Sequence, residues 1–329
     1  MASTDNSTNS VFKHFNWQTF VSGGIAGSIA KTLVAPIDRV KILKQVHSRH
    51  YDGYGVFESF FRIYEKEGFL ALYKGNGAQM IRIFPYAALQ FTSYETFKTI
   101  NKKIFKKNST NIINSLACGS LAGITAVSFT YPLDVIRSRL AFQFKGEHVY
   151  KGILDAIVKI YAEKNSLTSF FRGYLITILG MVPYAGISFS SFEHIKKYVL
   201  NRKIIYMTSK SNAHKNEINS HDYYELSVVG KLLCGAMTGI IAQTITYPLD
   251  VVRRHMQLSK MISETRSKMG IIQTFNYVYS EYGVVKGLYR GITLNYVRAV
   301  PMVSTSFCFY ELSKKFFGLK TGEFIKLAG

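Results

Sequence analysis

Long stretches without charged side chains alternate with short charged segments along the chain. Residues 108–133, 173–192 and 232–249 contain no Asp, Glu, Lys or Arg. A helix needs about 20 largely apolar residues to cross a hydrocarbon core, and a buried soluble helix would explain one such stretch but not several. The pattern therefore predicts an all-α membrane protein. Six long helices are expected, over residues 16–45, 76–102, 111–142, 174–200, 227–257 and 292–317.

The six prolines reveal an internal repeat. Pro36, Pro132 and Pro248 each begin a Pro-x-Asp-x-x-(Lys/Arg) string and lie 13 residues after a glycine that starts a Gly-x-x-x-Gly. The other three prolines are each followed, nine residues later, by an aromatic-Glu-x-x-Lys string. They are Pro85, Pro183 and Pro301. Matching offsets in three copies indicate a repeat architecture. We expect each copy to be a long helix, a loop with a short helix, and a second long helix.

The three repeats account for most of the chain. They are expected over residues 16–105, 110–200 and 226–318. Polar segments are expected at 1–15, 201–225 and 319–329. Short helices near 54–64, 152–162 and 268–281 are charged on one face and aromatic on the other, which is typical of helices that lie in the membrane interface. The Gly-x-x-x-Gly pairs are expected to let neighbouring helices approach closely.

Charge and composition narrow the range of functions. The net charge is +21, but the basic residues recur between apolar stretches instead of forming one patch, which disfavours nucleic-acid binding. The mean hydropathy of +0.06 fits spanning helices that have a polar face along a water-filled path. The three cysteines and the scattered histidines suggest neither a metal site nor a catalytic pair, so an enzyme is disfavoured. A channel remains an alternative to a carrier, and saturable flux with counter-exchange would distinguish them.

With these strings the sequence resembles the mitochondrial carrier family. The family signature is Pro-x-(Asp/Glu)-x-x-(Lys/Arg), then (Asp/Glu)-Gly, then aromatic-(Lys/Arg)-Gly, in triplicate, and the resemblance covers residues 20–317. Repeat one contains Glu67-Gly68 and Tyr73-Lys74-Gly75. In repeats two and three, Asn165-Ser166 and Tyr282-Gly283 replace the acid–glycine pair, and we expect these departures to weaken the contacts on the matrix side.

The resemblance implies a fold, a location and partners. It implies six transmembrane helices in three pseudo-threefold repeats, with short amphipathic helices on the matrix side of the mitochondrial inner membrane. It also implies a monomer that contacts membrane lipid, with cardiolipin at the matrix-side helices, and that has no cofactor, no metal and no nucleic-acid partner. Strings around Pro36, Pro85 and Pro301 look most like the subgroup of the Graves disease carrier and the coenzyme A carriers.

The resemblance further implies two gates. Proline inside a helix removes a backbone hydrogen bond and bends the helix, and the charges after Pro36, Pro132 and Pro248 would then pair between repeats as a matrix gate. Its pairs are Asp38–Arg137, Asp134–Arg253 and Asp250–Lys41, with Gln45 and Gln257 as braces and Ala141 in the third brace position. The cytosolic gate consists of Glu95–Lys196, Glu193–Lys314 and Glu311–Lys98. Ordinary surface ion pairs are the alternative reading of such residues.

The substrate is expected to bind between the gates. The contact positions of the family lie three residues before the second proline of each repeat, and they hold Arg82, Gly180 with Met181, and Arg298. Lys31 is a third cation, at a position that the family points into the cavity. Residues one turn from the contacts could add hydrogen bonds or could simply fill space. They are Gln79, Thr177 and Asn295.

A glycine followed by an aliphatic residue or Met at the second contact, as in Gly180-Met181, resembles the carriers of adenine-containing solutes in this family, because the missing side chain leaves a slot for a flat ring. Together with the three cations, this resemblance implies a multiply charged anion that contains adenine. Arginine presents a planar fork that suits phosphate. Coenzyme A, adenosine 3′,5′-diphosphate, ADP and ATP all satisfy this description. The subgroup resemblance favours exchange of coenzyme A, together with adenosine 3′,5′-diphosphate, by alternating access. An ADP/ATP or ATP-Mg/phosphate carrier is the alternative, although the arginine and methionine string of the ADP/ATP exchanger is interrupted here over residues 253–258.

Overall fold

A computed structural model describes most of the chain. The described residues are 17–48, 51, 53–104, 112–144, 149–163, 166–202, 204, 208–210 and 224–319. The predicted N-terminal tail, nearly all of the predicted C-terminal tail and most of the predicted connecting segment 201–225 therefore lie outside the described residues, as does Asn165.

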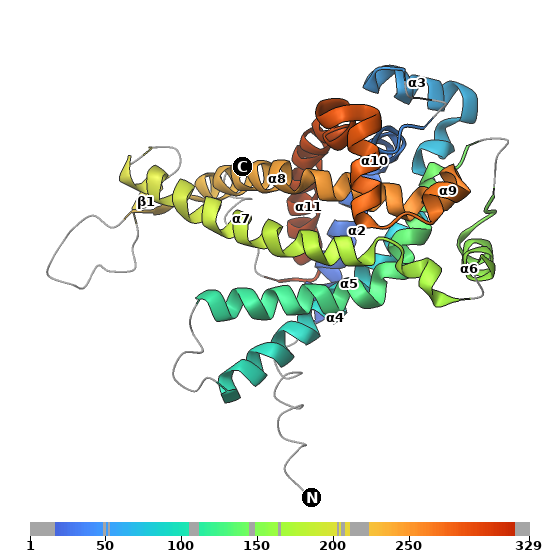
Figure 1. Ribbon diagram of the computed structural model, residues 1–329. Coiled ribbons are helices and arrows are strands. Elements are labelled where there is room, and N and C mark those ends of the chain that lie inside the picture. Colours follow the sequence, from blue (N-terminus) through green and yellow to red (C-terminus); the bar gives the residue numbers. More distant parts are fainter. Residues whose placement is uncertain are drawn as a thin grey trace, which may run out of the picture. The chain divides into compact units, whose positions relative to one another are not determined.

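Six long helices form the framework, as the apolar stretches predict (Figure 1). They are α2 (Trp17–Gln45), α4 (Asn76–Ile104), α5 (Ile112–Phe142), α7 (Tyr174–Asn201), α8 (Val228–Ile262) and α11 (Ile292–Phe316). Five of the expected spans agree with these bounds to within two residues at each end. Helix α8 continues five residues beyond the expected end at 257. Each of the six helices contains one of the six prolines in its interior.

Short helices connect the long helices within each repeat. They are α3 (Val56–Glu67), η1 (Phe69–Tyr73), α6 (Ile153–Ala162), η2 (Leu167–Phe171), α9 (Glu264–Ser267), α10 (Ile271–Gly283) and η3 (Val284–Leu288). The expected helix at 268–281 corresponds to α10, whereas α9 and the η turns were not predicted. Phe57, Leu154 and Ile272 on α3, α6 and α10 are 82%, 80% and 75% exposed. Apolar faces this open are typical of helices that lie in a membrane interface.

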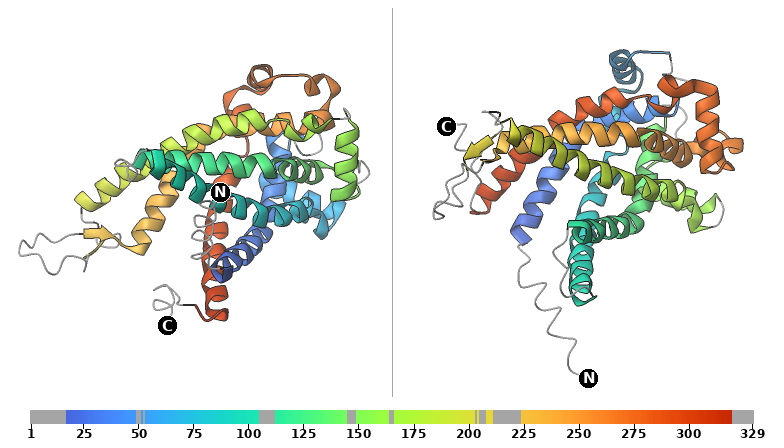
Figure 2. Two further views of the ribbon diagram at one scale, coloured as in Figure 1. Left: turned by 90° about the horizontal axis from the view of Figure 1, so that it is seen from below. Right: turned by 60° about the vertical axis from the view of Figure 1, so that its left-hand side comes forward.

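The chain divides into two compact units, residues 1–175 with 251–329 and residues 176–250. In the first unit, α4 packs along α5 and α11 packs along α2 (Figure 1). In the second unit, Val199 of α7 packs with Leu226 and Cys234. A short antiparallel hairpin of β1 (Thr208–Lys210) and β2 (Tyr224–Leu226) precedes α8 (Figure 2). The sequence pattern did not predict this hairpin, which lies inside the expected connecting segment.

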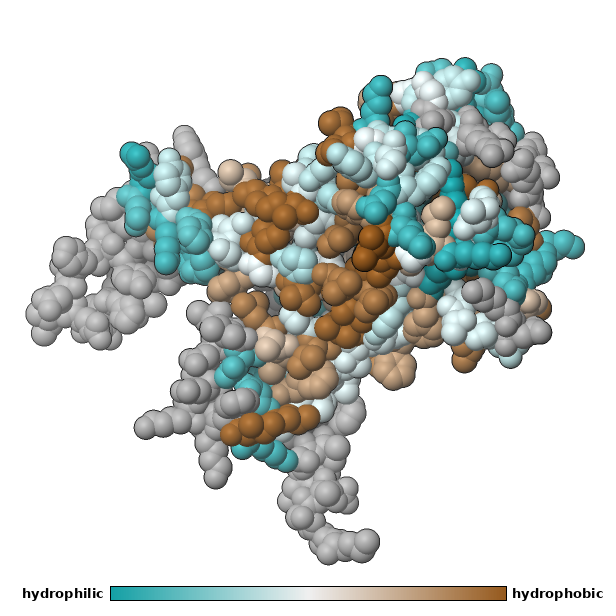
Figure 3. Space-filling view, viewed as in Figure 1, coloured by the Kyte–Doolittle hydropathy of each residue, from teal (hydrophilic) through white to brown (hydrophobic). Residues whose placement is uncertain are grey.

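Large apolar side chains remain exposed on the long helices. Phe129 on α5, Val182 on α7 and Ile245 on α8 are 71%, 58% and 57% exposed. Figure 3 shows hydrophobic side chains along these helices and hydrophilic side chains nearer their ends. Among the described residues, four helical segments are long and apolar enough to cross a membrane by length and composition. Such a surface is suited to hydrocarbon rather than water.

Glycine is required where each aromatic–basic–glycine motif turns into the next long helix. Gly75 and Gly173 have φ values of +84° and +80°. A Cβ at Gly75 would lie 2.7 Å from the Arg137 carbonyl oxygen, and a Cβ at Gly173 would lie 3.3 Å from that of Arg253. Glycine adopts this backbone conformation without strain, and its missing side chain lets the first helix of the following repeat approach the turn.

The Gly-x-x-x-Gly expectation is wrong for the first repeat. A Cβ at Gly23 would meet no described atom within 4 Å, and one at Gly27 would only touch Ile83 at 3.9 Å. The close contact falls instead on Gly24, where a Cβ would overlap the Phe84 ring. The direction of each side chain around the helix, rather than the four-residue spacing, decides which glycine faces α4.

The Gly75→Ala substitution tests this close approach. We expect it to destabilise the protein by about 1–3 kcal/mol, because alanine is strained at positive φ and its methyl group meets the α5 backbone. Thermal unfolding of the purified protein in detergent measures the effect. Gly53→Ala is the control, since a Cβ there meets no described atom within 4 Å. Equal losses of stability in the two variants would contradict the interpretation.

Candidate functional site

A buried aspartate on α2 binds two arginines from different repeats. The Asp38 side chain is 6% exposed. Its Oδ2 accepts a hydrogen bond from Arg137 Nη2 of α5 at 2.6 Å. Its Oδ1 accepts one from Arg298 Nη1 of α11 at 2.5 Å. The first contact joins a pair of the predicted matrix gate. The second ties a predicted substrate contact to the same carboxylate.

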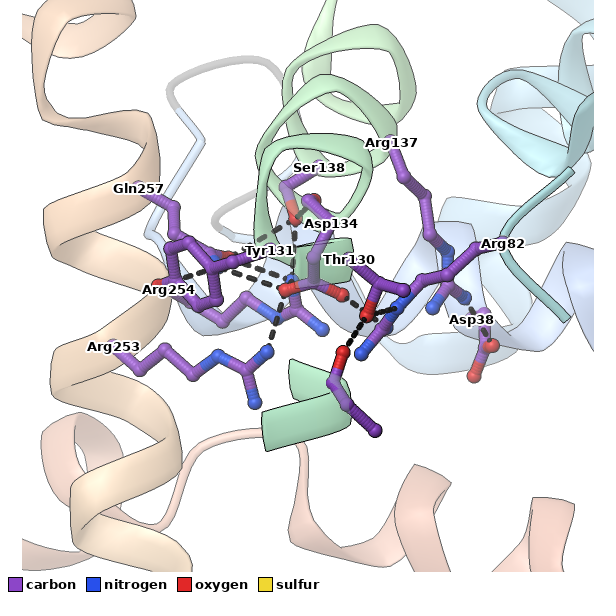
Figure 4. Close-up of polar contacts among 11 residues, drawn as sticks. Asp38, Arg82, Thr130, Tyr131, Asp134, Arg137, Ser138, Arg253, Arg254 and Gln257 are labelled. Carbon is purple, nitrogen blue, oxygen red and sulfur yellow. Dashed lines mark hydrogen bonds and ion pairs between the residues drawn. The ribbon is translucent and has the colours of Figure 1, made fainter. Parts of the chain in front are cut away.

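Asp134 on α5 has the same arrangement (Figure 4). Its side chain is 2% exposed. Oδ2 accepts from Arg253 Nη2 of α8 at 2.5 Å, and Oδ1 accepts from Arg82 Nη1 of α4 at 2.7 Å. Gln257, a predicted brace, donates from Nε2 to Asp134 Oδ2 at 2.8 Å and to the Tyr131 hydroxyl at 3.1 Å. Each carboxylate therefore binds two arginines from other repeats. One arginine comes from the first long helix of its repeat and the other from the second long helix of its repeat.

Further contacts surround Gln257. Its Oε1 accepts hydrogen bonds from Ser138 Oγ at 3.0 Å and from Arg254 Nη1 at 2.8 Å. Arg254 also lies 4.0 Å from Asp134 Oδ2. The sequence interpretation assigned no role to Arg254 or Ser138. The signal available for Arg254 was its position, directly after a predicted gate cation.

The third repeat differs from the other two. Asp250 accepts a hydrogen bond at 3.2 Å from Gln243 Nε2 of its own helix. Lys41 Nζ donates to Asn295 Oδ1 of α11 at 2.9 Å. Asn295, expected near the substrate, thus contacts a predicted gate residue. Asp250 and Lys41 belong to different units, so their pairing stays a prediction.

The remaining predicted binding residues lie on the long helices. Gln79 is buried on α4, with a side-chain oxygen that has no hydrogen-bond partner among the described residues. Thr177 is buried on α7, where Gly180 and Met181 follow about one turn later. Lys31 precedes Asp38 by seven residues on α2, which is two helical turns and places both on one face. Gln45 is fully buried at the end of α2, and its bracing role stays a prediction.

The residues of the predicted cytosolic gate form ion pairs within single helices. Glu95 with Lys98, Glu193 with Lys196, and Glu311 with Lys314 lie 3.7, 4.0 and 3.9 Å apart. Residues three apart on a helix are neighbours, so these pairs need no other helix. The expected pairs join different helices. That pairing stays a prediction, and these same-helix contacts are the arrangement that the structure describes.

Each repeat has a contact near the position of the acid–glycine pair, and none of these contacts was predicted. In repeat one, buried Arg39 bonds the Glu67 carboxylate at 2.9 Å. In repeat two, where Asn165 replaces the acid, Glu163 bonds buried Arg139. In repeat three, the Tyr282 ring stacks on His47, with 3.5 Å between the ring centroids. The departures from the family signature are thus accompanied by other contacts, and the expectation of a weakened matrix side stays a prediction.

Glu67 binds two cations. It accepts a 2.6 Å hydrogen bond from Lys74 Nζ, in addition to its bonds from Arg39. Burial acts to raise the pKa of Glu67, but the Lys74 and Arg39 contacts outweigh it and lower that pKa below its ordinary value. Burial and the neighbouring Glu67 raise the pKa of Tyr51 to about 12, so Tyr51 stays neutral and donates to Glu67 Oε1 at 3.3 Å.

The repeats agree with a known family. The family model described as mitochondrial carrier protein matches residues 12–104, 108–203 and 224–321, which is most of the chain. The chain belongs to the mitochondrial carrier family. Members of this family are multi-pass proteins of the mitochondrial inner membrane, and this carrier has their fold of three tandem repeats with two spanning helices each.

Relatives of this carrier span nearly its whole length. Solute carrier family 25 member 16 from Homo sapiens is 47% identical over 308 residues, covering 93% of this chain and 90% of its own. Mitochondrial coenzyme A transporter SLC25A42 from Danio rerio is 39% identical over 299 residues, covering 90% and 86%. Mitochondrial carrier protein CoAc2 from Zea mays is 37% identical over 306 residues, covering 89% and 84%. The subgroup resemblance drawn from the sequence is confirmed.

The Glu67→Gln substitution tests the buried ion-pair cluster. Removing the carboxylate charge leaves buried Arg39 without its counter-ion, which typically costs about 3–5 kcal/mol. We expect a large fall in the melting temperature at neutral pH, measured by thermal unfolding in detergent. The pKa of Glu67 is lowered in the folded state, so its stabilisation is present at neutral pH and is lost as the pH falls through that lowered pKa. The difference in melting temperature between Glu67→Gln and the wild type should therefore become smaller at low pH.

Glu65→Gln is the matched control, because Glu65 lies on the same helix and is exposed. Its free energy of unfolding should stay within about 0.5 kcal/mol of that of the wild type. Indistinguishable melting of the two variants at neutral pH would show that the cluster does not stabilise the fold.

Proposed function

We propose that this carrier exchanges coenzyme A, and also adenosine 3′,5′-diphosphate, across the mitochondrial inner membrane. The observation that carries the proposal is the shared carboxylates, since Arg82 and Arg298 bind the same aspartates as the inter-repeat pairs. The printed names of the relatives from Danio rerio and Zea mays favour this substrate over ADP or ATP. The protein acts as a transporter and not as an enzyme, and coenzyme A is its cargo rather than a cofactor.

The charges of the proposed site suit this substrate. Arg82, Arg298 and Lys31 supply three cations, and coenzyme A carries a diphosphate and a 3′-phosphate. Guanidinium groups bind phosphate through two parallel hydrogen bonds, which fixes its orientation as well as its charge. Intramembrane cations of this kind normally mark a substrate pathway. A slot at Gly180 and Met181 would receive the adenine ring.

Substrate binding would loosen the gate through the shared carboxylates. A phosphate that takes Arg82 removes one of the cations that bind Asp134, and a phosphate that takes Arg298 does the same at Asp38. The closed gate would then bury an acid with one counter-charge fewer, and because an under-neutralised buried charge is costly, the state in which Asp38 and Asp134 reach water would be favoured. A ligand shifts a conformational equilibrium only through such differential interactions. The geometry of the two aspartates supports this coupling.

The charged residues of the predicted cytosolic gate would close the opposite side of the carrier. Glu95, Glu193 and Glu311 pair with lysines on their own helices at 3.7, 4.0 and 3.9 Å, and partly exposed pairs such as Glu95–Lys98 and Glu193–Lys196 contribute only about 0–1 kcal/mol. Exchanging those partners for lysines of neighbouring repeats therefore costs little. Two gates of modest strength are what alternating access requires.

A lipid site and a monomeric state are also proposed for this carrier. A cavity of about 650 Å³ lies between the start of α4 and the start of α6, and Lys74, Gly75, Lys151 and Gly152 line it. Helix N-termini with nearby lysines favour phosphate, which supports cardiolipin at this matrix-side position. One chain supplies all three repeats, so we propose a monomer as the transporting unit.

The role of the arginine fork is tested by Arg298→Lys. We expect coenzyme A uptake into proteoliposomes to fall at least tenfold, because a point charge cannot make both parallel hydrogen bonds to phosphate. Arg202→Lys, an exposed position at the end of α7, is the control and should transport normally. Normal uptake by Arg298→Lys at unchanged protein stability would remove Arg298 from the substrate site.

The substrate is tested by competition against labelled coenzyme A in proteoliposomes. We expect dephospho-coenzyme A to compete about tenfold more weakly than coenzyme A, a difference of about 1.4 kcal/mol, because a cation loses its phosphate partner. ATP should also compete more weakly than coenzyme A. Equal competition by all three would identify a general adenine nucleotide carrier instead.

A further inference from the structure

Another cavity lies between segments of repeats two and three. Its volume is about 110 Å³, far more than the roughly 10–15 Å³ that one water molecule needs. All the residues that line it have polar or charged side chains, and three of them are the hydroxyl residues Thr168, Ser169 and Ser267. The lining residues belong to the first unit, so their mutual geometry is internal to it. None of them has a role in the proposed substrate site or in either predicted gate.

The lining of this cavity carries more positive than negative charge. Its cations are Arg139 of α5, Arg172 at the end of η2 and Lys260 of α8, and Glu163 is the one acid among the described residues that line it. Lys260 also binds Glu264 at 3.0 Å, but that glutamate is 85% exposed and lies outside the lining. Even when both acids are counted, three cations face two carboxylates. One positive charge therefore remains for a ligand.

Arg172 connects repeat two to repeat three without the help of a carboxylate. Its Nε donates to the Met256 carbonyl oxygen of α8 at 3.1 Å, and its Nη2 donates to the Arg266 carbonyl oxygen of α9 at 3.2 Å. These carbonyls fix the guanidinium but leave its charge in place. A guanidinium has five N–H donors, and Nη1 of Arg172 has no partner among the described residues. Part of the fork is thus available to an anion.

Arg139 has an unsatisfied donor. Its side chain is 1% exposed. Nη1 donates to the Tyr150 hydroxyl at 3.0 Å, and Nη2 donates to Glu163 Oε2 at 3.2 Å. Nε is buried and has no hydrogen-bond partner among the described residues. Because a guanidinium stays protonated, this N–H always needs an acceptor, and a buried donor without one is costly. An oxyanion in the cavity would supply the acceptor.

We propose that this cavity binds a small phosphate-class anion, which bridges Arg139 and Arg172 of repeat two to Lys260 of repeat three. Arginine forks and hydroxyl donors are the groups that bind phosphate oxygens. The phosphate is free rather than a lipid headgroup, because no apolar side chain lines the cavity to receive an acyl chain. The Arg253–Asp134 pair joins the same two repeats. The bound anion therefore stabilises the arrangement in which repeats two and three lie together.

The test is thermal unfolding of the purified, delipidated carrier in detergent, in sodium phosphate against sodium chloride of equal ionic strength. A ligand that binds only the folded state raises the melting temperature as its concentration exceeds its Kd. We expect Lys260→Gln to need at least tenfold more phosphate than the wild type for the same rise, because a charged hydrogen bond is lost. Ser169→Ala should also bind phosphate more weakly, and it decides the question if Lys260→Gln does not fold.

Lys159→Gln is the matched control. Lys159 also pairs with an acid four residues away on its helix, Asp155 at 2.9 Å, and its side chain is 44% exposed against 38% for Lys260. Lys159 does not line the cavity. It should follow the wild-type phosphate curve. Phosphate also stabilises proteins in general through its exclusion from their surface, and this control measures that contribution.

The remaining outcomes would overturn the proposal. An equal response to phosphate in the wild type, Lys260→Gln and Ser169→Ala would show that the cavity binds no anion. A response that is kept in Lys260→Gln but weakened in Arg298→Lys would place the phosphate among the proposed substrate residues. Stabilisation by soluble short-chain phosphatidic acid but not by inorganic phosphate, lost in Lys260→Gln, would identify a lipid headgroup as the ligand. None of these measurements depends on coenzyme A transport, so the proposed function can fail without this inference and the reverse.

Discussion

The arrangement of this carrier depends on two buried carboxylates that are each shared by two arginines. An isolated charge at membrane depth is costly, and Asp38 and Asp134 are tolerable only because cations surround them. Each carboxylate has one oxygen for the neighbouring repeat and one for a second helix. The requirement for neutralisation therefore joins the ion pairs between repeats to Arg82 and Arg298, for which we propose a role in substrate binding.

The three repeats differ in the residues that contact their aspartates. Asp38 and Asp134 each bind an arginine from a second helix of another repeat, whereas Asp250 binds a neutral amide, Gln243, of its own helix. A substrate with several phosphates at one end and a flat base elsewhere has the same asymmetry. Identical arms would suit a small symmetric anion, so the departures from the repeat are the positions where specificity is expected to reside.

The matrix-side contacts show that a repeat can keep its function with different chemistry. Arg39 with Glu67 and Arg139 with Glu163 each connect a long helix to the short-helix segment of its own repeat, whereas Tyr282 of repeat three stacks on His47, which follows α2 of repeat one. The arginines occupy different offsets from their prolines, and the third contact has no carboxylate. Burial of each contact, rather than the identity of its residues, is the shared physical feature.

The sequence by itself determined the number of repeats, the long helices, and the positions of Asp38, Asp134, Arg82 and Arg298, because apolar stretches and fixed offsets are local properties of the chain. It could not determine that each of these aspartates binds two arginines, that Glu163 serves where Asn165 would not, or that Gly24 rather than Gly23 meets α4. Those facts depend on side chains that are separated by many residues along the chain and that meet only when helices pack. The direction of each side chain around its helix, and the distance between helices, decide such contacts, and neither is encoded in spacing alone.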